Sequence, residues 1–447
     1  MNFELGEEQA RCLNSIKEFI KSNELAFSIT GSGGTGKTVL TFEIIKYLES
    51  IRKDYRLCAP THKAKCVLEH YTNRQALTLH KLLSLSPKLD IINLDFKDLQ
   101  FKMGNINDFP INGVIICDES SMISDDLFKT LTKVCKTYDT KIIFLGDKCQ
   151  LSPVDSNRVS LVYNLENKFN LTKIYRQSSE NAIFPILQDL REHKIDQFTS
   201  CSGTDGSVVC ESNFKEFFNL CKLGIGKAIK NEDIFEAKVL AYTNARVNNY
   251  NDFLTKSIFG DSEEYYNLEI LTGYENISFD HYGFWNSMDY IIVGEPKKTD
   301  IYIPGFYNLP GYQLNLYDTG SKEIMPVDII SKNLGSRVYS DLASYIEEIR
   351  LGAISSEGKR RSMYWKEYYS VLGSFTTPVD LLYRNRLIRR KSFDRGYAIT
   401  IHKSQGSSIN NIYIDMQDIK KAKSDDTIRQ LQYVAMSRTR HNAYIFQ

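Results

Sequence analysis

Three features are missing from this chain of 447 residues, and each absence excludes a class of protein. No apolar run approaches the ~18 residues that a membrane-spanning helix needs. The nine cysteines, all between Cys12 and Cys221, include no C-x-x-C pair, which disfavours a zinc site or a disulfide framework. Glu4, Glu7 and Glu8 stand where a secretory signal would be basic and apolar. We therefore expect a cytoplasmic location and no membrane association.

An excess of charge of either sign is also missing. The 56 lysines and arginines offset the 55 aspartates and glutamates, which leaves a formal net charge of +1. Any nucleic-acid partner must therefore be bound by local patches rather than by overall charge. The chain is too long for one ordinary core, so we expect about two to four domains.

The most informative feature that is present is the run Gly31-Ser32-Gly33-Gly34-Thr35-Gly36-Lys37-Thr38. It fits the phosphate-binding pattern G-x-x-x-x-G-K-[ST] and stands between a strand-like and a helix-like stretch. The glycines let the backbone curl around a triphosphate, and the start of the helix adds positive potential. We expect Lys37 to reach the β- and γ-phosphates of ATP and Thr38 to hold Mg²⁺ through its hydroxyl.

The pattern of apolar residues predicts an α/β fold. Strand-like stretches are expected at 25–30, 56–60, 113–118 and 141–146, with helix-like stretches between them, which indicates a parallel sheet. A second α/β region starts near residue 181. Its strands are expected at 238–243, 396–401, 411–416 and 443–447. Ligands of such sheets bind at the carboxyl ends of the strands, so the polar clusters that end these stretches are expected to converge.

Several of these clusters suit phosphoryl transfer. We assign Asp118 to Mg²⁺ and Glu119 to the orientation and deprotonation of an attacking water. Gln150, which follows the next strand, is expected to hydrogen-bond the γ-phosphate or that water. Arg176 and Arg438 are candidates for a guanidinium that reaches the γ-phosphate from a second lobe.

Another set of residues suits a phosphodiester backbone. Hydroxyl, imidazole and amine groups, together with the N–H groups of helix starts, are the usual contacts of phosphate and sugar. Such side chains gather at Thr61, His62, Lys63, Thr78, His80, Thr400, His402, Lys403 and Ser404. Metal binding by the three histidines is disfavoured, because carboxylate or cysteine partners at ligand spacing are missing.

Two segments interrupt the α/β pattern. Residues 87–103 partly alternate apolar and polar, which predicts a hairpin that projects from the sheet, with a solvated crossover loop as the alternative. The segment 261–394 carries 15 of the 27 tyrosines, and its aromatic and β-branched runs predict a small β-rich insertion. Its basic clusters at 359–361 and 384–391 suit either a single-strand channel or a solvated helix face.

In this order, the motifs resemble those of superfamily 1 DNA helicases of the RecD-like group, which includes the small Dda helicases of bacteriophages. The matching positions are Gln9, 31–38, 59–64, 78–80, 118–122, 146–147, Gln150, Arg176, 241–244, Thr400, 402–406 and 433–440. The resemblance implies two RecA-like lobes with ATP between them and single-stranded DNA across both. It also implies translocation in the 5′→3′ direction with unwinding of duplex DNA.

The resemblance further implies roles for single residues. Gln9 would read adenine, and Gln405 and Gly406 would link the nucleotide to the DNA track. Thr243 and Asn244 would join the DNA contacts.

The resemblance also implies a division of the chain. The first RecA-like lobe would comprise 1–83 and 111–178, and the second 179–260 and 395–447. A strand-separating pin at 84–110 would carry Phe96 or Phe101 near its tip, and an SH3-like module would occupy 261–394. The implied protein is a monomer of bacterial or phage-infected cytoplasm that binds single-stranded DNA and its junctions with duplex, in replication, recombination or repair.

Three other functions remain compatible with these residues. A P-loop kinase of nucleosides or metabolites would share the phosphate loop but would need no second lobe bearing Arg438. An ATP-gated DNA-binding switch would share every nucleotide motif, and only the pin distinguishes a helicase from it. An RNA-directed motor would recognise 2′-hydroxyl groups, which no motif of this chain reveals.

Overall fold

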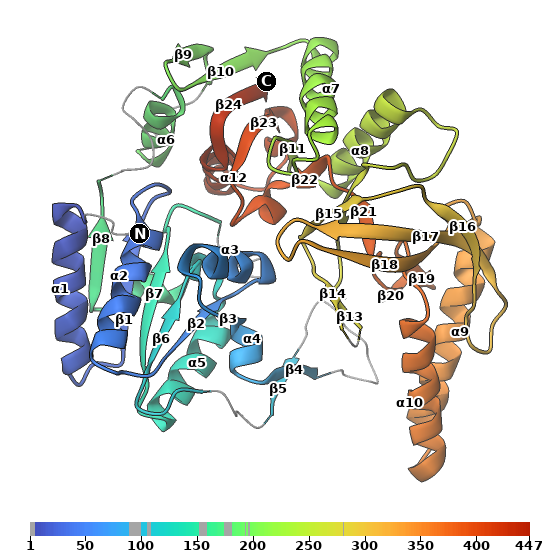
Figure 1. The fold of residues 1–447 in the computed structure, drawn as a ribbon, viewed down its shortest axis with the longest axis horizontal. Coiled ribbons are helices and arrows are strands. Elements are labelled where there is room, and N and C mark those ends of the chain that lie inside the picture. Colours follow the sequence, from blue (N-terminus) through green and yellow to red (C-terminus); the bar gives the residue numbers. More distant parts are fainter. Residues whose placement is uncertain are drawn as a thin grey trace.

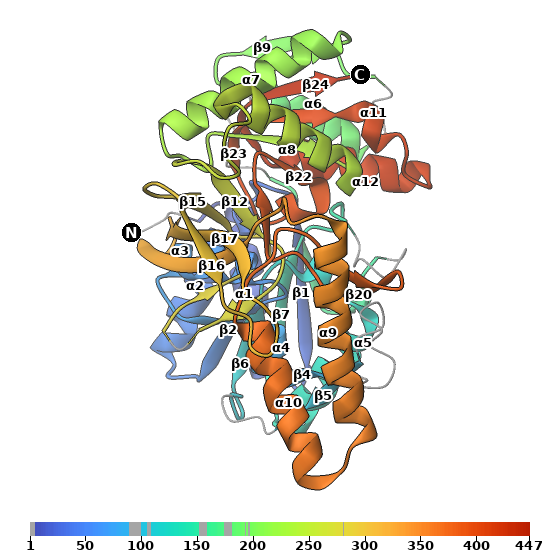
Figure 2. The same cartoon turned by 90° about the vertical axis from the view of Figure 1, so that its right-hand side faces the viewer.

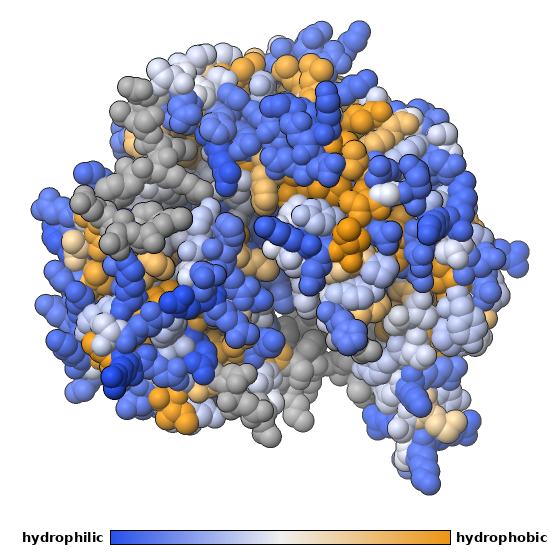
Figure 3. Space-filling model, viewed as in Figure 1, coloured by the Kyte–Doolittle hydropathy of each residue, from blue (hydrophilic) through white to orange (hydrophobic). Residues whose placement is uncertain are grey.

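The computed structural model describes residues 5–88, 100–104, 109–151, 159–173, 181–192, 194, 197–279 and 281–447. Two sheets flanked by helices form two lobes, and a third sheet packs beside the second lobe (Figure 1). Polar side chains cover most of the face in Figure 3, and apolar ones gather where the second lobe meets the third sheet. No helix within the described ranges is long and apolar enough to cross a membrane.

The first lobe is built on a parallel sheet. Its strands are β1 (Ala26–Gly31), β2 (Tyr55–Ala59), β3 (Ala76–Thr78), β6 (Val114–Cys117), β7 (Lys141–Gly146) and β8 (Lys168–Leu171). They lie in the order β3-β2-β6-β7-β1-β8, and every pair is parallel. The four strands expected from the sequence are present. The two edge strands were not predicted, because three or four residues carry too little pattern to be recognised.

Helices cover both faces of this sheet. They are α1 (Glu7–Lys21), α2 (Lys37–Ser50), α3 (His62–Thr72), α4 (Leu79–Leu82) and α5 (Asp125–Thr137), with short 3-10 turns η1 (Ser120–Met122) and η2 (Leu161–Asn164). Ile143 and Leu145 of β7 pack with α1, α2 and α3, whereas Ile142 and Phe144 pack with α4 and α5. Both faces of the central strands are therefore buried, which explains their continuous apolar sequences.

The predicted projecting hairpin is present at its base. Strands β4 (Leu85–Lys88) and β5 (Gln100–Met103) pair antiparallel, with Leu85 opposite Met103. They lie below the first sheet in Figure 1. Phe96 and the side chain of Phe101 lie outside the described residues, so the identity of the tip residue stays a prediction.

The second lobe has a mostly parallel sheet. Its strands are β9 (Cys201–Gly203), β10 (Gly206–Glu211), β11 (Ala237–Ala241), β22 (Ala398–Thr400), β23 (Ile409–Asp415) and β24 (Thr439–Phe446). They lie in the order β22-β11-β23-β24-β10-β9, and only the edge pair β9–β10 is antiparallel. The helical elements of this lobe are α6 (Ile183–Arg191), α7 (Phe214–Lys230), α8 (Asn244–Phe259), η3 (Ile401–Ser404), α11 (Met416–Ile419) and α12 (Asp425–Ser437).

An antiparallel insertion separates α8 from β22. Its strands are β12 (Ile270–Gly273), β13 (Ile277–Ser278), β14 (Gly283–Phe284), β15 (Asp289–Ile292), β16 (Lys297–Ile301), β17 (Leu309–Asp318), β18 (Glu323–Ile330), β19 (Leu381–Tyr383), β20 (Arg386–Arg389) and β21 (Phe393–Arg395). The main sheet runs β16-β17-β15-β12-β21, with β18 on β17. This architecture agrees with the β-rich segment expected from composition.

The insertion also contains two helices that the sequence did not predict as an element. Helices α9 (Ser336–Ser355) and α10 (Gly358–Gly373) form a hairpin that projects from the molecule (Figure 2). Tyr368 of α10 is buried in the core of the insertion, and the ring of Trp365 meets it edge-on at 5.5 Å. The basic residues 359–361 are exposed at the start of α10, which favours the solvated helix face over a channel lining.

Candidate nucleotide and DNA sites

The phosphate loop joins β1 to α2, as the sequence predicted. Gly34 and Gly36 have φ angles of 87° and 78°, in the left-handed region that strains residues with a Cβ. An added Cβ at Gly31 would lie 2.5 Å from Thr35 Oγ1, so packing also requires glycine there. A Cβ at Gly33 would meet no atom within 4 Å, so that position faces open space over the loop.

Lys37 and Thr38 open α2 beside this loop. The Nζ atom of Lys37 donates hydrogen bonds to the carbonyl oxygens of Gly31 (2.7 Å) and Ser32 (3.1 Å). The ammonium group therefore lies over its own loop. The hydroxyl of Thr38 makes no hydrogen bond with any residue that the structure describes, and its oxygen remains available to a ligand.

Gln9 of α1 binds the same loop. Its Nε2 atom donates to the carbonyl oxygens of Thr35 (3.2 Å) and Gly36 (3.3 Å), and its Oε1 accepts the N–H of Gly6 at 3.0 Å. The structure thus brings Gln9 to the phosphate loop, while its recognition of adenine stays a prediction.

Asp118 and Glu119 follow β6 and face Lys37. One oxygen of Asp118 accepts the N–H of Glu119 at 2.9 Å, and Glu119 has a left-handed φ of 52°. Burial raises the pKa of both carboxyls; the Asp118 carboxylate adds to the shift at Glu119, and the charges of Arg438 and Lys37 oppose it. A half-buried carboxyl with a raised pKa, on a residue whose backbone is strained, is typical of a general base.

The donor groups at this position fit Mg²⁺. This ion is usually held by one or two carboxylates, water and substrate phosphates rather than by a cage of protein ligands. The second carboxylate oxygen of Asp118 and the hydroxyl of Thr38 make no hydrogen bond with described residues. Together they offer the hard oxygen ligands that this ion prefers.

The segment that follows β7 connects the two lobes. Gln150 is buried, and its Oε1 accepts no hydrogen bond in the described part of the chain. Asp147, also buried, accepts a hydrogen bond of 2.7 Å from the hydroxyl of Tyr433 on α12. Arg191 of α6 donates to the same hydroxyl at 3.3 Å. Sequence reasoning gave Asp147 and Tyr433 no role, although both lie in the motifs that carried the resemblance.

Arg438 caps the end of α12 and faces the first lobe. Its guanidinium donates to the hydroxyl of Ser437 at 2.9 Å and to the carbonyl oxygen of Ser407 at 3.5 Å. It forms no ion pair with any described residue, yet its charge reaches Glu119. The second predicted arginine, Arg176, lies outside the described residues.

The predicted link between nucleotide and DNA lies where the lobes meet. Gly406 has a φ of 76°, and an added Cβ there would come within 3.9 Å of the backbone of Ala64 in α3. Gln405 is buried beside it, and its Nε2 has no hydrogen-bond partner among described residues. The turn after η3 therefore abuts the start of α3.

The four threonines predicted to bind DNA are all helix N-caps. Their hydroxyls each accept the N–H three residues later, at 3.2 to 3.4 Å: Thr61 on α3, Thr78 on α4, Thr243 on α8 and Thr400 on η3. Helix starts carry unpaired N–H groups and positive potential. Two helix starts from each lobe are therefore placed at the carboxyl ends of the strands, a placement that suits phosphates.

Not every predicted contact points outward. Thr243 also donates to the Asp418 carboxylate at 3.0 Å, and Ser404 is buried with its hydroxyl donating to the carbonyl oxygen of Ile401 at 2.7 Å. These two hydroxyls stabilise the second lobe from within, which does not favour their DNA roles. Asn244, at the start of α8, is exposed.

The basic residues of the predicted track lie close to the insertion. Lys403 places its Nζ 3.0 Å from the ring centroid of Tyr274, and burial lowers its pKa to about 7. Burial lowers the pKa of Lys63 to about 8, an effect that the Asp289 carboxylate opposes. Burial also lowers the pKa of His80 and of His402.

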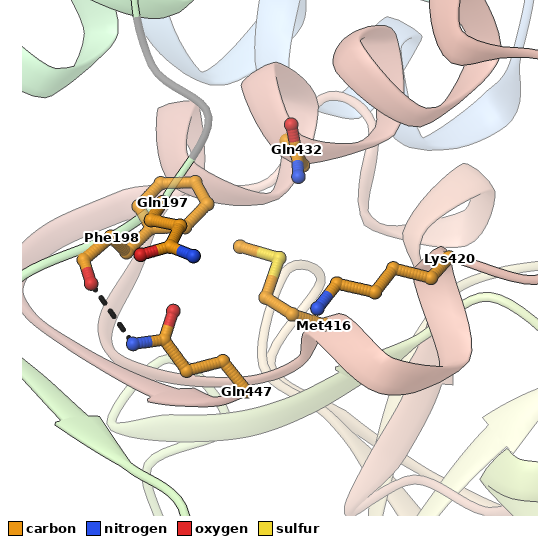
Figure 4. A pocket seen from close by; sticks show the side chains of 6 residues that line it. All are labelled: Gln197, Phe198, Met416, Lys420, Gln432 and Gln447. Atoms are coloured by element: carbon orange, nitrogen blue, oxygen red, sulfur yellow. Dashed lines mark hydrogen bonds between the residues drawn. The ribbon is translucent and has the colours of Figure 1, made fainter.

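The pocket of Figure 4 is separate from these groups. It lies in the second lobe and is lined by Gln197, Phe198, Met416, Lys420, Gln432 and Gln447. Gln447 closes one side through a 2.9 Å hydrogen bond to the carbonyl oxygen of Phe198. No residue of the phosphate loop lines it, so the chemistry lies elsewhere.

Comparison with known proteins agrees with this geometry. An AAA domain model matches residues 4–213, and a model of the UvrD-like helicase C-terminal domain matches residues 395–446. The ATP-dependent DNA helicase dda of Enterobacteria phage T4 is 24% identical over 99% of this chain and 99% of its own. These matches agree with the resemblance to RecD-like helicases of superfamily 1 that the motifs carry. The RecD2 helicase of Deinococcus radiodurans is 31% identical over 41% of this chain and 23% of that protein.

Solved structures show the same fold as this chain. Pif1 of Candida albicans has a TM-score of 0.51 at 16% identity, over 100% of this chain and 95% of that one. Pif1 of Bacteroides in complex with ADP-AlF3 and single-stranded DNA has a TM-score of 0.51 at 16% identity. This match covers 99% of this chain and 92% of that one. The two sheets of this chain are accordingly RecA-like lobes.

Proposed function

We propose that this protein is a helicase that hydrolyses ATP to move 5′→3′ along single-stranded DNA and to unwind the duplex ahead of it. One observation carries the proposal. The Glu119 carboxyl of the first lobe interacts with the charge of Lys37 in its own lobe and with the charge of Arg438 in the second lobe. The relatives support it, since they include an ATP-dependent DNA helicase and a Pif1 bound to single-stranded DNA.

Hydrolysis at this site depends mainly on positioning and charge. Lys37 exchanges its two carbonyl contacts for the β- and γ-phosphates, while Glu119 takes the proton of the attacking water and Gln150 orients that water. Thr38 and Asp118 would hold Mg²⁺, which when bound neutralises phosphate charge. Arg438, and in the same role Arg176, stabilises the charge that develops on the γ-phosphate.

Movement follows from the contacts between the lobes. The turn at Gln405 and Gly406 abuts α3, whose N-terminal residues are proposed to bind DNA, so a shift of one lobe displaces DNA contacts of the other. Alternating grip by the two sets then advances the strand. The sets are Thr61, His62, Lys63, Thr78 and His80 in the first lobe and Asn244, Thr400, His402 and Lys403 in the second. Thr243 and Ser404 are left out of the second set, because their hydroxyls bond within the lobe.

The proposed substrates are single-stranded DNA and its junctions with duplex. A monomer suffices, because one chain supplies both lobes. A P-loop kinase is disfavoured, since it needs neither a second RecA-like lobe nor its arginine. Replication or recombination proteins are the proposed partners.

The proposal is tested by measuring ATP hydrolysis with and without single-stranded DNA, alongside unwinding of duplexes that bear a 5′ or a 3′ tail. We expect strong stimulation by DNA and unwinding from the 5′ tail alone. Unwinding from the 3′ tail would contradict the polarity. Equal hydrolysis with and without DNA would contradict the motor function.

The hairpin requires a separate test. Replacement of residues 89–99 by a short Gly-Ser linker leaves β4 and β5 in place and removes the proposed wedge. We expect this variant to keep DNA-stimulated hydrolysis and to lose most strand separation, measured on the same 5′-tailed duplex. Unwinding at the wild-type rate would show that the hairpin is not the pin.

A further inference from the structure

Two aromatic rings meet where the first lobe touches the insertion. The imidazole of His62, the first residue of α3, stacks on the indole of Trp285, which follows β14. The ring centroids are 4.3 Å apart and the planes differ by 6°. His62 belongs to the first lobe and Trp285 to the insertion, and these two parts share no sheet. The stacked rings therefore lie across the interface between them.

The position of Trp285 is set by its own domain. Its backbone N–H donates to the hydroxyl of the buried Tyr290 at 2.8 Å. An added Cβ at Gly283 would lie 3.0 Å from Cζ2 of the indole, so the ring lies against a strand that has no side chain there. The indole would therefore keep its place if His62 moved away.

His62 resembles a nucleobase in shape and charge. Burial, together with the charges of Lys65 and Lys81, lowers its pKa to about 4, so its imidazole is uncharged at neutral pH. An uncharged, flat heteroaromatic ring stacked at 4.3 Å makes the kind of contact that a DNA base makes with an aromatic side chain. Both rings are only partly buried, so their edges are reachable.

Phosphate-binding groups lie next to this stack. Thr61, which precedes His62, caps α3 by accepting the N–H of Ala64, and the first N–H groups of a helix have no partner within the helix. Lys63 follows directly, and its charge interacts with Asp289 of the insertion and with Arg438 of the second lobe. A strand whose phosphates meet the start of α3 would have its bases within reach of the indole.

We infer that Trp285 is a stacking platform for a base of the bound single strand, and that this base takes the place held by the ring of His62. The inference rests on the proposed function and assigns a contact to a residue of the insertion. Every base has a flat face, so stacking is tolerant of sequence, as a motor requires. Displacement of His62 also frees the start of α3 when the strand enters.

The indole can report on its own occupancy, because the chain has two tryptophans, Trp285 and Trp365. In a Trp365→Phe variant the emission comes from Trp285 alone. We expect this emission to change when an oligothymidylate is added. We also expect an oligonucleotide carrying 5-iododeoxyuridine to cross-link to Trp285 under ultraviolet light. Unchanged emission with no cross-link, while the oligonucleotide is bound, would overturn the inference.

Two substitutions of Trp285 distinguish stacking of a base on its ring from simple filling of space by its side chain. We expect Trp285→Leu to weaken binding of oligothymidylate about tenfold and Trp285→Phe less than threefold, since one stacked base is removed only in the first. The matched control is Tyr302→Leu, which removes an exposed ring of the same insertion. A leucine variant that binds as well as the phenylalanine variant would contradict the platform.

The two proposals fail differently. If the wild-type protein binds single-stranded DNA and hydrolyses ATP faster in its presence, but Trp285 does not respond, only the platform is wrong. If the wild-type protein does not bind single-stranded DNA, both the proposed function and the stacking role of Trp285 are wrong.

Discussion

Glu119 is the residue on which the proposed hydrolysis depends most directly. Its backbone is left-handed although it is not glycine, which costs free energy, and its half-buried carboxyl lies beside Asp118. Burial and the neighbouring carboxylate raise its pKa, which makes it a better base toward water. The sequence indicated this role because a pair of acids follows an apolar strand, but the backbone conformation became visible only in the structure.

We expect Glu119→Gln to lower DNA-stimulated ATP hydrolysis about 10²- to 10⁴-fold, because the amide cannot accept the proton of water. Binding of a fluorescent ATP analogue reports whether the nucleotide site remains intact. The matched control is Asp126→Asn, which removes an exposed acid from the first turn of α5. Hydrolysis within tenfold of the wild-type rate would assign the base to another group.

Lys403 makes the proposed DNA contact dependent on pH. Its pKa is lowered to about 7 by burial and by the charges of Lys391 and Lys63, and Asp289 and Asp394 oppose the shift. The amine is therefore mostly charged below pH 7 and mostly neutral above it. A phosphate binds the charged form, so affinity for single-stranded DNA should fall as the pH rises through 7.

Between pH 6.5 and 8.5 we expect this residue to weaken DNA binding by at most about 25-fold, the fall in its charged fraction. Fluorescence anisotropy of a labelled oligothymidylate at constant ionic strength measures the change. Lys403→Arg keeps its charge throughout and should flatten the profile. Lys63, with a pKa of about 8, contributes the remainder, so Lys63→Arg is the second control. An unchanged profile in Lys403→Arg would exclude Lys403 from the contact.

At the scale of elements, α12 links hydrolysis to the arrangement of the lobes. Arg438 caps its end, and Tyr433 on the same helix donates to Asp147, which follows β7. Gln150 lies three residues beyond Asp147, and its N–H donates to the Asp147 carbonyl. In the proposed mechanism Gln150 responds to the γ-phosphate, and these contacts transmit the change through Asp147 to α12.

Tyr433→Phe removes this inter-lobe hydrogen bond and leaves the ring in place. A hydrogen bond to a charged group contributes about 1.5–3 kcal/mol, so we expect strand separation to slow about tenfold or more. The informative quantity is the ratio of base pairs separated to ATP hydrolysed, measured on the same duplex. The control is Tyr71→Phe, an exposed hydroxyl on α3. A ratio equal to that of the wild type would show that this hydrogen bond does not couple ATP hydrolysis to strand separation.

Elements also show where sequence reasoning was incomplete. The threonines at strand ends were predicted as phosphate contacts, and each proved to be a helix N-cap, a role that its position before a helix already suggests. The hairpin α9–α10 was missed because its aromatic and β-branched residues are typical of strands.

At the scale of the whole molecule, a buried ion pair holds the insertion on the second lobe. Lys238 of β11 lies 3.0 Å from the Asp289 carboxylate of β15, and both side chains are buried. Lys238 also donates to the carbonyl oxygen of Gly396, where the chain returns from the insertion to the lobe. The same carboxylate balances the charge of Lys63 in the first lobe. Asp289 of the insertion therefore interacts with a lysine of each lobe.

We expect Asp289→Asn to destabilise the docking of the insertion, because it leaves Lys238 charged and buried without its partner. Loss of one member of such a pair typically costs about 3–5 kcal/mol. The measurement is the midpoint of thermal unfolding, together with protease cleavage around residues 261 and 395. Removal of both charges in Lys238→Met with Asp289→Leu should restore part of the loss. An unchanged midpoint in Asp289→Asn would show that the pair contributes little.

The sequence by itself determined what depends on local chemistry. Glycines in the phosphate loop, apolar runs in the central strands and acids at a strand end are each encoded within about ten residues, so the nucleotide site and the α/β fold could be predicted. Only the tertiary structure decided the pairs Asp147–Tyr433, His62–Trp285 and Lys238–Asp289. Their members lie far apart in the chain and in different parts of the molecule. No spacing in the sequence encodes such a contact, because it exists only after two independently packed surfaces meet.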